Sequence, residues 1–263
     1  MTAPTWVTSR DNPLLKEMRK VAQGNTEYRK AGRFWVEGDH LCSAALRRGV
    51  TPAVAIYSES FWHLDRAQYA QSAIKSVVIP DLLFAELSAL ESPARVGFVV
   101  DLPTDVVFQP SAATVVLDRV QDAGNVGSIL RSAGAFGFGQ VLALKGTAAL
   151  WSPKVLRAGM GAHFGLTLIE GIAPAELDAL KAPLVVTSSH QGALIQNLQI
   201  PWPCAWAFGH EGQGVCAELM GRAGHFARIG QPGGEESLNV AAAAAICLHA
   251  SSVNQYPITP RPL

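Results

Sequence analysis

The feature that most constrains the fold is the regular alternation of short apolar runs and helix-like segments in the second half of the chain. The apolar runs cover residues 114–117, 140–144, 166–169, 184–187, 204–208 and 226–229. Helices are predicted at residues 126–136, 154–160, 175–181 and 215–221, and an alanine-rich helix follows Leu238. Short, purely apolar strands separated by helices are typical of a mostly parallel sheet covered on both faces. We therefore predict an α/β fold.

The first part of the chain shows the same alternation on a smaller scale. A first helix is predicted at residues 11–22, with Asp11 or Asn12 as its cap and Pro13 in its first turn. Further helices are predicted at residues 40–48, 64–74 and 81–87, between strands at residues 34–36, 54–57, 77–79 and 96–100. Strands that alternate with helices in this way again indicate α/β layers, now in a unit long enough for a small domain.

The boundary between the two halves is predicted at residues 101–112, where two prolines and polar residues surround a short apolar run. The domains are thus expected at residues 1–102 and 113–252. The proline-containing end, residues 253–263, is expected to be a disordered tail.

Charge alone does not indicate a partner, because 21 Lys and Arg balance 21 Asp and Glu. The distribution is uneven: residues 1–50 hold nine basic and five acidic residues, a difference of +4, which leaves −4 for the remainder. A basic segment of this kind either contacts phosphates or forms a solvated helix face.

The four cysteines, Cys42, Cys204, Cys216 and Cys247, form no C-x-x-C pair and have no histidine at metal-binding spacing. They are predicted to be buried free thiols of a reducing compartment, with no metal partner. The longest apolar run, Val240 to Leu248, is too short to span a bilayer, and the N-terminus lacks a secretory signal. The expected location is cytoplasmic, with no membrane partner.

Three loops are candidates for a ligand site, because ligands of parallel sheets bind at the carboxyl ends of strands. They cover residues 118–126, 209–214 and 230–239, and each combines glycines with polar residues. The third loop leads into a helix that Ser237 or Asn239 can cap, and such a helix start offers unpaired N–H groups. A dinucleotide-binding loop is rejected at residues 137–139, because this glycine-containing stretch precedes a strand instead of following one. A hydrolase nucleophile is rejected at Ser237, because this serine lacks a G-x-S-x-G context.

The polar residues of these loops carry a resemblance. The ordered patterns are Asn125-x-Gly127-x-x-x-Arg131, Gly209-x-Glu211-x-x-Gly214 and Ile229-x-x-x-Gly233-x-x-x-Ser237-Leu238-Asn239-Val240. Together they resemble the three motifs of the SpoU/TrmH family of RNA 2′-O-ribose methyltransferases. The stretches SRDNPLLKEMRK (residues 9–20) and FWVEGDHL (residues 34–41) are similar to the L30e-like RNA-binding domain of rRNA-directed members. The sequence departs from the family at Gly230-Gln231, where Pro-Met is common, and at Ala241, which is often Ser.

The resemblance implies a trefoil-knotted, mostly parallel C-terminal domain of the SPOUT type and a smaller L30e-like α/β domain. It implies a homodimer that transfers methyl from S-adenosyl-L-methionine to a ribose 2′-hydroxyl of RNA, with rRNA favoured over tRNA. The alternatives are a tRNA 2′-O-methyltransferase and a non-catalytic ribosome-assembly factor that binds RNA.

The resemblance also implies roles for particular residues. The implied catalytic residues are Arg131, Asn125, Glu211, Ser237 and Asn239, and the implied cofactor-binding residues are Gly209, Ile229, Leu238 and Thr187. Arg131 is assigned as a base in the family. Because a guanidinium is normally not deprotonated in proteins, it can instead bind a phosphate or a developing oxyanion.

Overall fold

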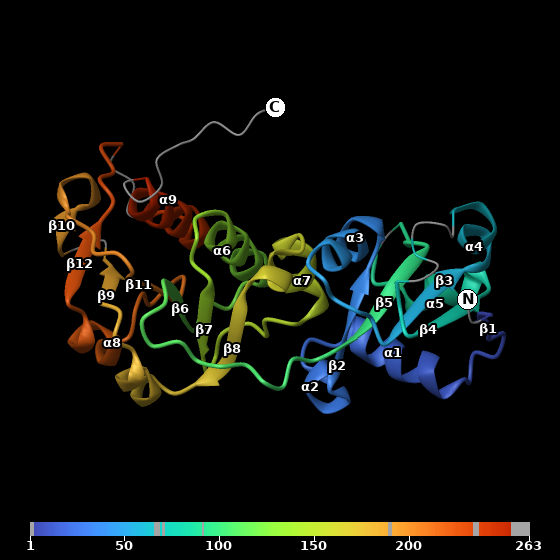
Figure 1. Ribbon diagram of the computed structural model, residues 1–263. Helices are drawn as coiled ribbons and strands as arrows, with labels where there is room; N and C mark the ends of the chain where they lie inside the picture. Colours follow the sequence, from blue (N-terminus) through green and yellow to red (C-terminus); the bar gives the residue numbers. More distant parts are fainter. Residues whose placement is uncertain are drawn as a thin grey trace. The chain divides into compact units, whose positions relative to one another are not determined.

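The computed structural model describes residues 3–65, 69, 72–90, 92–188, 191–233 and 237–253 (Figure 1). The chain divides into two compact units: Met1–Asp105 with Trp151–Phe164, and Val106–Leu150 with Gly165–Leu263. The segment Trp151–Phe164 therefore belongs to the first unit, although it lies within the range predicted for the second domain. The predicted tail lies outside the described residues except for Val253.

The first unit contains a five-stranded mixed sheet in the order β1-β4-β3-β5-β2. Its strands are β1 (Thr5–Trp6), β2 (Arg33–Glu37), β3 (Val54–Ser58), β4 (Lys75–Ile79) and β5 (Val96–Asp101). Strand β5 runs antiparallel to β2 and β3, whereas β1, β3 and β4 run parallel. The helices of this unit are α1 (Pro13–Gln23), α2 (Glu27–Ala31), α3 (Asp39–Arg47), α4 (Glu59–Asp65), α5 (Asp81–Leu87) and α7 (Pro153–Gly159). Helix α7 belongs here because it packs against α1 and β2.

Helix α1 begins as the sequence predicts. Of the two candidate caps, Asn12 is the one used, since its Oδ1 accepts a hydrogen bond of 3.0 Å from the backbone N of Leu14. Pro13 occupies the first helical position, where its missing N–H costs nothing. Leu15, Met18 and Val21 are buried at helical spacing.

The helix predicted at residues 64–74 is wrong where the structure describes that range beyond Asp65, while residues 66–68, 70 and 71 lie outside the described residues. Helix α4 starts directly after β3, where Ser58 Oγ accepts from Phe61 N at 3.4 Å, and ends at Asp65, while residues 72–74 are bends. The apolar residues that suggested a longer helix do not pack: Leu64 is 78% exposed and Ile74 75%. Helix α2 lies between the predicted first helix and the predicted strand at residues 34–36, where no element was predicted. It buries Tyr28, and its C-cap is Gly32 with φ 66°.

The second unit contains a seven-stranded sheet in the order β10-β12-β9-β11-β6-β7-β8, in which every neighbouring pair is parallel. This confirms the predicted parallel sheet. Its strands are β6 (Thr114–Asp118), β7 (Gln140–Leu144), β8 (Thr167–Ile172), β9 (Leu184–Thr187), β10 (Ala193–Leu194), β11 (Ala205–Gly209) and β12 (His225–Arg228). Its α-helices are α6 (Ala123–Ala135), α8 (Ala217–Arg222) and α9 (Val240–Ser252), and 3₁₀ helices lie at Pro174–Ala179 and Ile195–Asn197.

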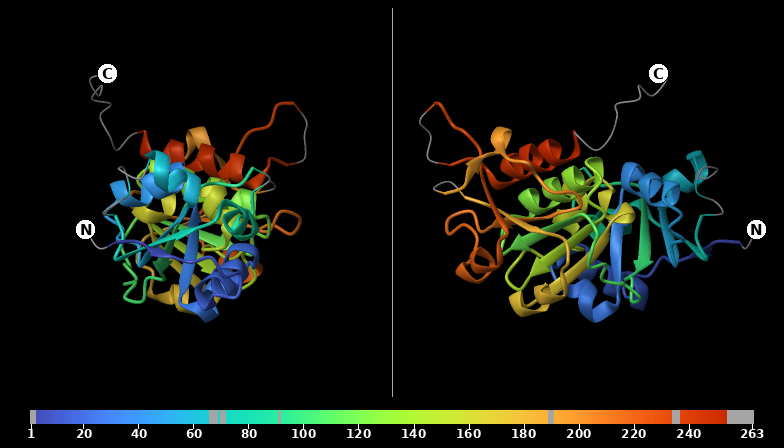
Figure 2. Two further views of the ribbon diagram at one scale, coloured as in Figure 1. Left: turned by 90° about the vertical axis from the view of Figure 1, so that its right-hand side faces the viewer. Right: turned by 60° about the vertical axis from the view of Figure 1, so that its left-hand side comes forward.

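Helices cover both faces of this sheet. Helices α6 and α9 lie side by side over one face, where α6 contacts β7 and α9 contacts β11 (Figure 2). On the other face, Leu177 and Leu219 pack into a core formed by strand residues such as Val116 and Leu142. The predicted helix at residues 175–181 is a 3₁₀ helix that ends at Ala179, because the Leu180 backbone turns to an extended conformation.

Three of the four cysteines are buried free thiols, as predicted, and Cys216 is half-buried. Burial raises the pKa of Cys204 and of Cys247 to about 12. None of the helices in the described part of the chain is long and apolar enough to cross a membrane.

Candidate functional site

The carboxyl ends of three adjacent strands, β11, β9 and β12, open into one pocket of about 1090 Å³. Ligand pockets typically have volumes of about 300–1,000 Å³, so this one has room for a large cofactor. Its walls come from the ends of these strands, from the loop after β11 and from the start of α9. The lining residues of the strand ends and the loop after β11 are Thr187, Ser188, residues 208–215, Ala227 and Ile229, and those before and in the first turn of α9 are Ser237, Leu238, Asn239, Val240 and Ala243.

Most of the residues predicted for the site are brought together here. Seven of the nine line the pocket: Glu211, Ser237, Asn239, Gly209, Ile229, Leu238 and Thr187. Asn125 and Arg131 do not line it. Both lie on α6, which begins in the loop after β6.

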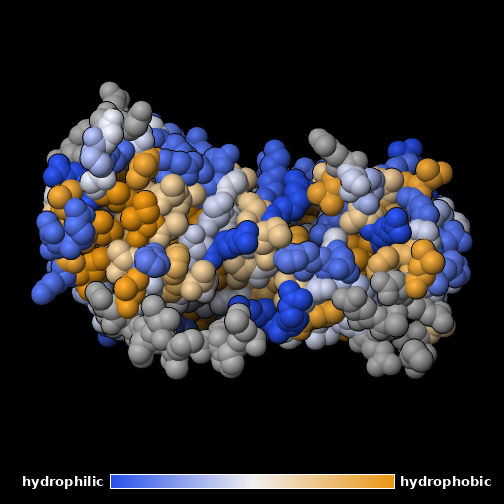
Figure 3. Space-filling model, turned by 90° about the horizontal axis from the view of Figure 1, so that it is seen from above, coloured by the Kyte–Doolittle hydropathy of each residue, from blue (hydrophilic) through white to orange (hydrophobic). Residues whose placement is uncertain are grey.

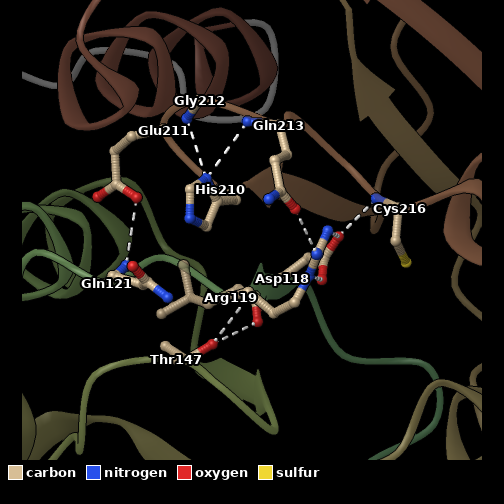
Figure 4. A network of polar contacts seen from close by, with 10 residues as sticks. Asp118, Arg119, Gln121, Thr147, His210, Glu211, Gly212, Gln213 and Cys216 are labelled. Atoms are coloured by element: carbon tan, nitrogen blue, oxygen red, sulfur yellow. Dashed lines mark hydrogen bonds and ion pairs between the residues drawn. The ribbon is translucent and has the colours of Figure 1, made fainter.

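Glu211 joins the loop after β11 to the loop after β6 (Figure 4). Its carboxylate accepts hydrogen bonds of 3.2 Å from the backbone N of Gln121, 3.2 Å from the backbone N of Asp122 and 3.0 Å from Asn125 Nδ2. Burial alone would raise the pKa of Glu211, but these hydrogen bonds lower it below its ordinary value. The carboxylate is therefore ionised at neutral pH.

Asn125 and Asn239 extend this network to the third loop. Asn239 Nδ2 donates to Asn125 Oδ1 at 2.9 Å, while Asn239 Oδ1 accepts from the backbone N of Ala241 and of Ala242. Of the two predicted caps of the last helix, Asn239 is thus the one used. Because the amide nitrogen of Asn125 donates to Glu211 and its amide oxygen accepts from Asn239, these two partners set the orientation of the Asn125 side chain.

Gly209 shows why the second loop needs a glycine. A Cβ atom at this position would lie 2.1 Å from the carbonyl carbon of Gly214 and 2.2 Å from Val215 N. His210 and Gly214 exchange two backbone hydrogen bonds, and His210 Nδ1 accepts from the backbone N of Gly212 and of Gln213. The loop therefore folds back tightly on itself, and only glycine allows this approach.

Arg131 lies outside this network. It is exposed on α6 and makes no hydrogen bond or ion pair with any of the residues that the structure describes. An exposed guanidinium with no protein partner is available to an anion that approaches from outside.

Sequence reasoning missed a second group of polar contacts beside the pocket. Asp118, which ends β6 and is 1% exposed, accepts from the Cys216 backbone N at 2.6 Å and from Arg119 Nε at 2.8 Å. Arg119 Nη1 donates to Gln213 Oε1 at 2.9 Å (Figure 4). The only signal in the sequence is an acidic residue directly after an apolar strand.

Comparison with known proteins identifies the family. Residues 112–249, more than half of the chain, match the SpoU rRNA Methylase family. The chain belongs to this family. Residues 12–97 match the MRM3-like substrate binding domain.

Similarity to known proteins extends over nearly the whole chain. The 23S rRNA (guanosine(2553)-2'-O)-methyltransferase RlmP of Bacillus subtilis is 29% identical over 92% of this chain and 97% of its own length. The 23S rRNA (uridine(2479)-2'-O)-methyltransferase of Streptomyces viridochromogenes is 26% identical over 92% of this chain and 90% of its own length. The AdoMet-bound rRNA methyltransferase of Sinorhizobium meliloti has a similar structure, with a TM-score of 0.82, 25% identity and coverage of 96% of this chain and 98% of that one. The resemblance seen in the three motifs is thus confirmed.

Proposed function

We propose that this SpoU-family chain transfers a methyl group from S-adenosyl-L-methionine to a ribose 2′-hydroxyl of ribosomal RNA. The observation that carries the proposal is the pocket at the carboxyl ends of β9, β11 and β12, whose loops are joined through Glu211, Asn125 and Asn239. Two relatives named as 23S rRNA 2′-O-methyltransferases each cover 92% of this chain, which carries both the SpoU family region and the substrate-binding region. This similarity favours rRNA over tRNA as the substrate.

The pocket fits the cofactor in size and chemistry. Its wall combines apolar side chains, including Ile229 and Leu238, with the exposed backbone of a glycine-containing loop. Gln231 also lines it, and Gln231 Oε1 is buried without a hydrogen-bond partner among the described residues, so a donor of a bound molecule can satisfy it. The backbone of Gly209, Ile229 and Leu238 would hold the cofactor, beside Thr187. When bound, the cofactor supplies an electrophilic methyl group on a sulfonium.

The protein's own residues position the acceptor and stabilise charge. Glu211 and Asn239 fix the Asn125 amide, and Ser237 lies exposed at the pocket wall. Such pre-oriented groups hold a ribose in line with the methyl group without reorganising during the reaction. Arg131 is assigned to the phosphate next to the acceptor or to the developing 2′-oxyanion, since arginine is suited to bind anionic oxygens through its planar set of N–H donors.

The first unit is proposed to bind the RNA. Four basic side chains of its N-terminal segment, Lys20, Lys30, Arg47 and Arg48, are exposed and form no ion pair with any residue in the described ranges. Exposed, unpaired cations are suited to contact phosphates, whose neutralisation drives much of nucleic-acid binding.

The active form is proposed to be a homodimer. Helix α9 is mostly apolar, yet only Ala244, Cys247, Leu248, Ser251 and Ser252 are buried. Its outward residue Ile246 is 41% exposed, and apolar side chains gather on the face that carries α9 (Figure 3). A second copy would cover this surface.

The knot, the cellular location and the absence of a metal ion are proposed on separate grounds. Family membership supports a trefoil knot in the second unit. The free thiols of the described cysteines support a reducing, cytoplasmic location. The reaction, as proposed, uses no metal ion.

The test is methyl transfer from S-adenosyl-L-methionine carrying a tritiated methyl group, with rRNA and tRNA as separate acceptors. Label in rRNA, at a position that resists alkaline cleavage because its 2′-oxygen is methylated, would support the proposal. Label in tRNA alone would replace it with a tRNA methyltransferase. Binding of RNA without labelling of either acceptor would replace it with a non-catalytic assembly factor.

A further inference from the structure

Arg119 holds a backbone conformation that its residue type rarely adopts. Its φ of 58° lies in the left-handed region, where the Cβ atom of an L-residue approaches the neighbouring carbonyl oxygen. Such a conformation is energetically costly and persists only when the surroundings impose it. A glycine would adopt it without this cost. The contacts of the Arg119 side chain therefore indicate what imposes this backbone conformation.

The guanidinium bridges two loops. Nε and Nη2 donate to the two carboxylate oxygens of Asp118 at 2.8 Å and 3.3 Å, and Nη1 donates to Gln213 Oε1 at 2.9 Å. The backbone N of Arg119 donates to Thr147 Oγ1 at 3.1 Å. Gly146 leaves room for this side chain, since a Cβ there would lie 3.1 Å from Arg119 Cγ.

The loop of residues 210–215, which follows β11, is thus attached to the end of β6 and to the loop after it at several points. Glu211 contacts Gln121 and Asp122 near one end of the loop, and Cys216 donates its backbone N–H to Asp118 just beyond the other end. The Arg119–Gln213 hydrogen bond lies between these two attachments, in the part of the loop that lines the pocket. Residues 211–214 are exposed, so burial contributes little to holding them in place.

We propose that Arg119 is a positioning residue: its bridge from Asp118 to Gln213 holds the loop of residues 210–215 in the shape that forms the cofactor pocket. This inference rests on the proposed function, because it takes the pocket to be the cofactor site. Arg119 acts through Gln213 and need not touch the cofactor itself.

The test uses Arg119→Gly, which keeps the left-handed backbone and removes only the bridge. We expect its melting temperature to stay close to that of the wild type, because relief of the strained φ offsets the loss of the ion pair with Asp118. The dissociation constant for S-adenosylhomocysteine, measured by calorimetry on the full-length chain, should rise by roughly five- to tenfold, as expected for the loss of a partly exposed charged hydrogen bond. With saturating cofactor, the turnover rate should be nearly unchanged, since the loop then closes on the bound cofactor.

Two further variants separate the bridge from other effects. Gln213→Ala should weaken binding by a similar factor, and the double variant should bind no more weakly than either single variant, because both changes break the same hydrogen bond. Arg33→Ala is the matched control: the Arg33 side chain is 33% exposed and pairs with Asp101, as the 32% exposed Arg119 pairs with Asp118. It should leave the dissociation constant unchanged.

These binding measurements separate a failure of the positioning role of Arg119 from a failure of the proposed methyltransferase function. If the wild type binds the ligand and Arg119→Gly binds it equally well, the positioning role is wrong while the proposed function stands. Weaker binding together with a lowered melting temperature would also overturn it, since Arg119 would then act on the stability of the whole unit. If the wild type itself binds neither S-adenosylhomocysteine nor S-adenosyl-L-methionine, the proposed function falls and takes the inference with it.

Discussion

At the scale of single residues, the site depends on polar side chains whose partners come from the protein itself. Glu211 accepts three hydrogen bonds, and Asn125 is held between Glu211 and Asn239. Groups fixed in this way do not have to reorganise when charge develops during a reaction. Arg131 is the exception, because no described residue holds it.

This difference leads to a prediction for Arg131→Ala. The side chain is exposed and has no described partner, so the free energy of unfolding should change by no more than about 0.5 kcal/mol. Methyl transfer should fall by at least about 100-fold, as for the loss of one charge-stabilising donor. Arg131→Lys should restore little, because an ammonium cannot reproduce a planar, two-pronged donor. Single-turnover methylation with saturating cofactor and RNA measures the rate of methyl transfer. A near wild-type rate in Arg131→Ala would show that Arg131 has only a binding or structural role.

Glu211 leads to a prediction about pH. The pKa of its carboxyl is lowered from 4.5, so its contribution to stability is fully present above 4.5 and is lost as the pH falls through the lower pKa of the folded state. Wild type should therefore melt at a higher temperature than Glu211→Gln near neutral pH, and the difference should shrink below 4.5. Thermal melts of both proteins across this range test it, and a difference that is independent of pH would contradict it.

The sequence predicted much of the site at this scale, but not all. Gly209, Glu211 and Asn239 could be found because they lie in loops after apolar strands and match the ordered motifs of the SpoU/TrmH family. Arg119 could not, since its role depends on a left-handed φ and on Gln213, a residue remote in the sequence. The sequence also could not predict that Arg131 lies outside the pocket lining, because the packing of a helix decides the direction in which each of its side chains points.

At the scale of elements, the starts of two helices build the site. Asp122 caps α6 by accepting from Asn125 N at 2.7 Å, and Asn239 caps α9. Asn239 has a double role, since its oxygen caps the helix while its nitrogen donates to Asn125. These two roles can be separated by mutation.

Asn239→Ala and Asn239→Asp should behave differently. Alanine removes the cap and should cost about 1 kcal/mol of stability, whereas aspartate caps equally well and should cost little. Aspartate cannot donate to Asn125, so methyl transfer should fall by about tenfold or more in both variants. Asn12→Ala, which removes the cap of α1, is the control: it should lose similar stability without a matching loss of transfer. Full activity in Asn239→Asp would rule out the orienting role.

The elements themselves were predictable where apolar runs are buried. The strands of the second sheet are short and mostly apolar, and each of the six predicted runs is contained in a strand or extends beyond one by a single residue. The helix expected at residues 64–74 is absent at its described end, residues 72–74, because apolar residues at helical spacing need not be buried, as the 75% exposed Ile74 shows. Strands β1 and β10 span two residues each, too few to give a periodic signal.

At the scale of the whole molecule, charge on the first unit should govern RNA affinity. Replacing Arg47 and Arg48 by glutamine removes two exposed cations and should weaken RNA binding. The slope of the logarithm of affinity against the logarithm of salt concentration should become shallower by about 1 for each phosphate that the protein no longer neutralises. Arg10→Gln is the control, because Arg10 is already paired with Glu86. Equal slopes for the double variant and the wild type would exclude these arginines from the RNA-binding surface.

The path of the chain through the two units has a consequence for biosynthesis. The first unit includes Trp151–Phe164, so α7 reaches its place against α1 and β2 only after β6 and β7 of the other unit have been made. Domains usually fold as units during translation, starting from the N-terminus. Here the ribosome must synthesise part of the second unit before the first has all of its residues. A nascent chain released at residue 105 would lack α7, and the completion of both units belongs to the later part of translation.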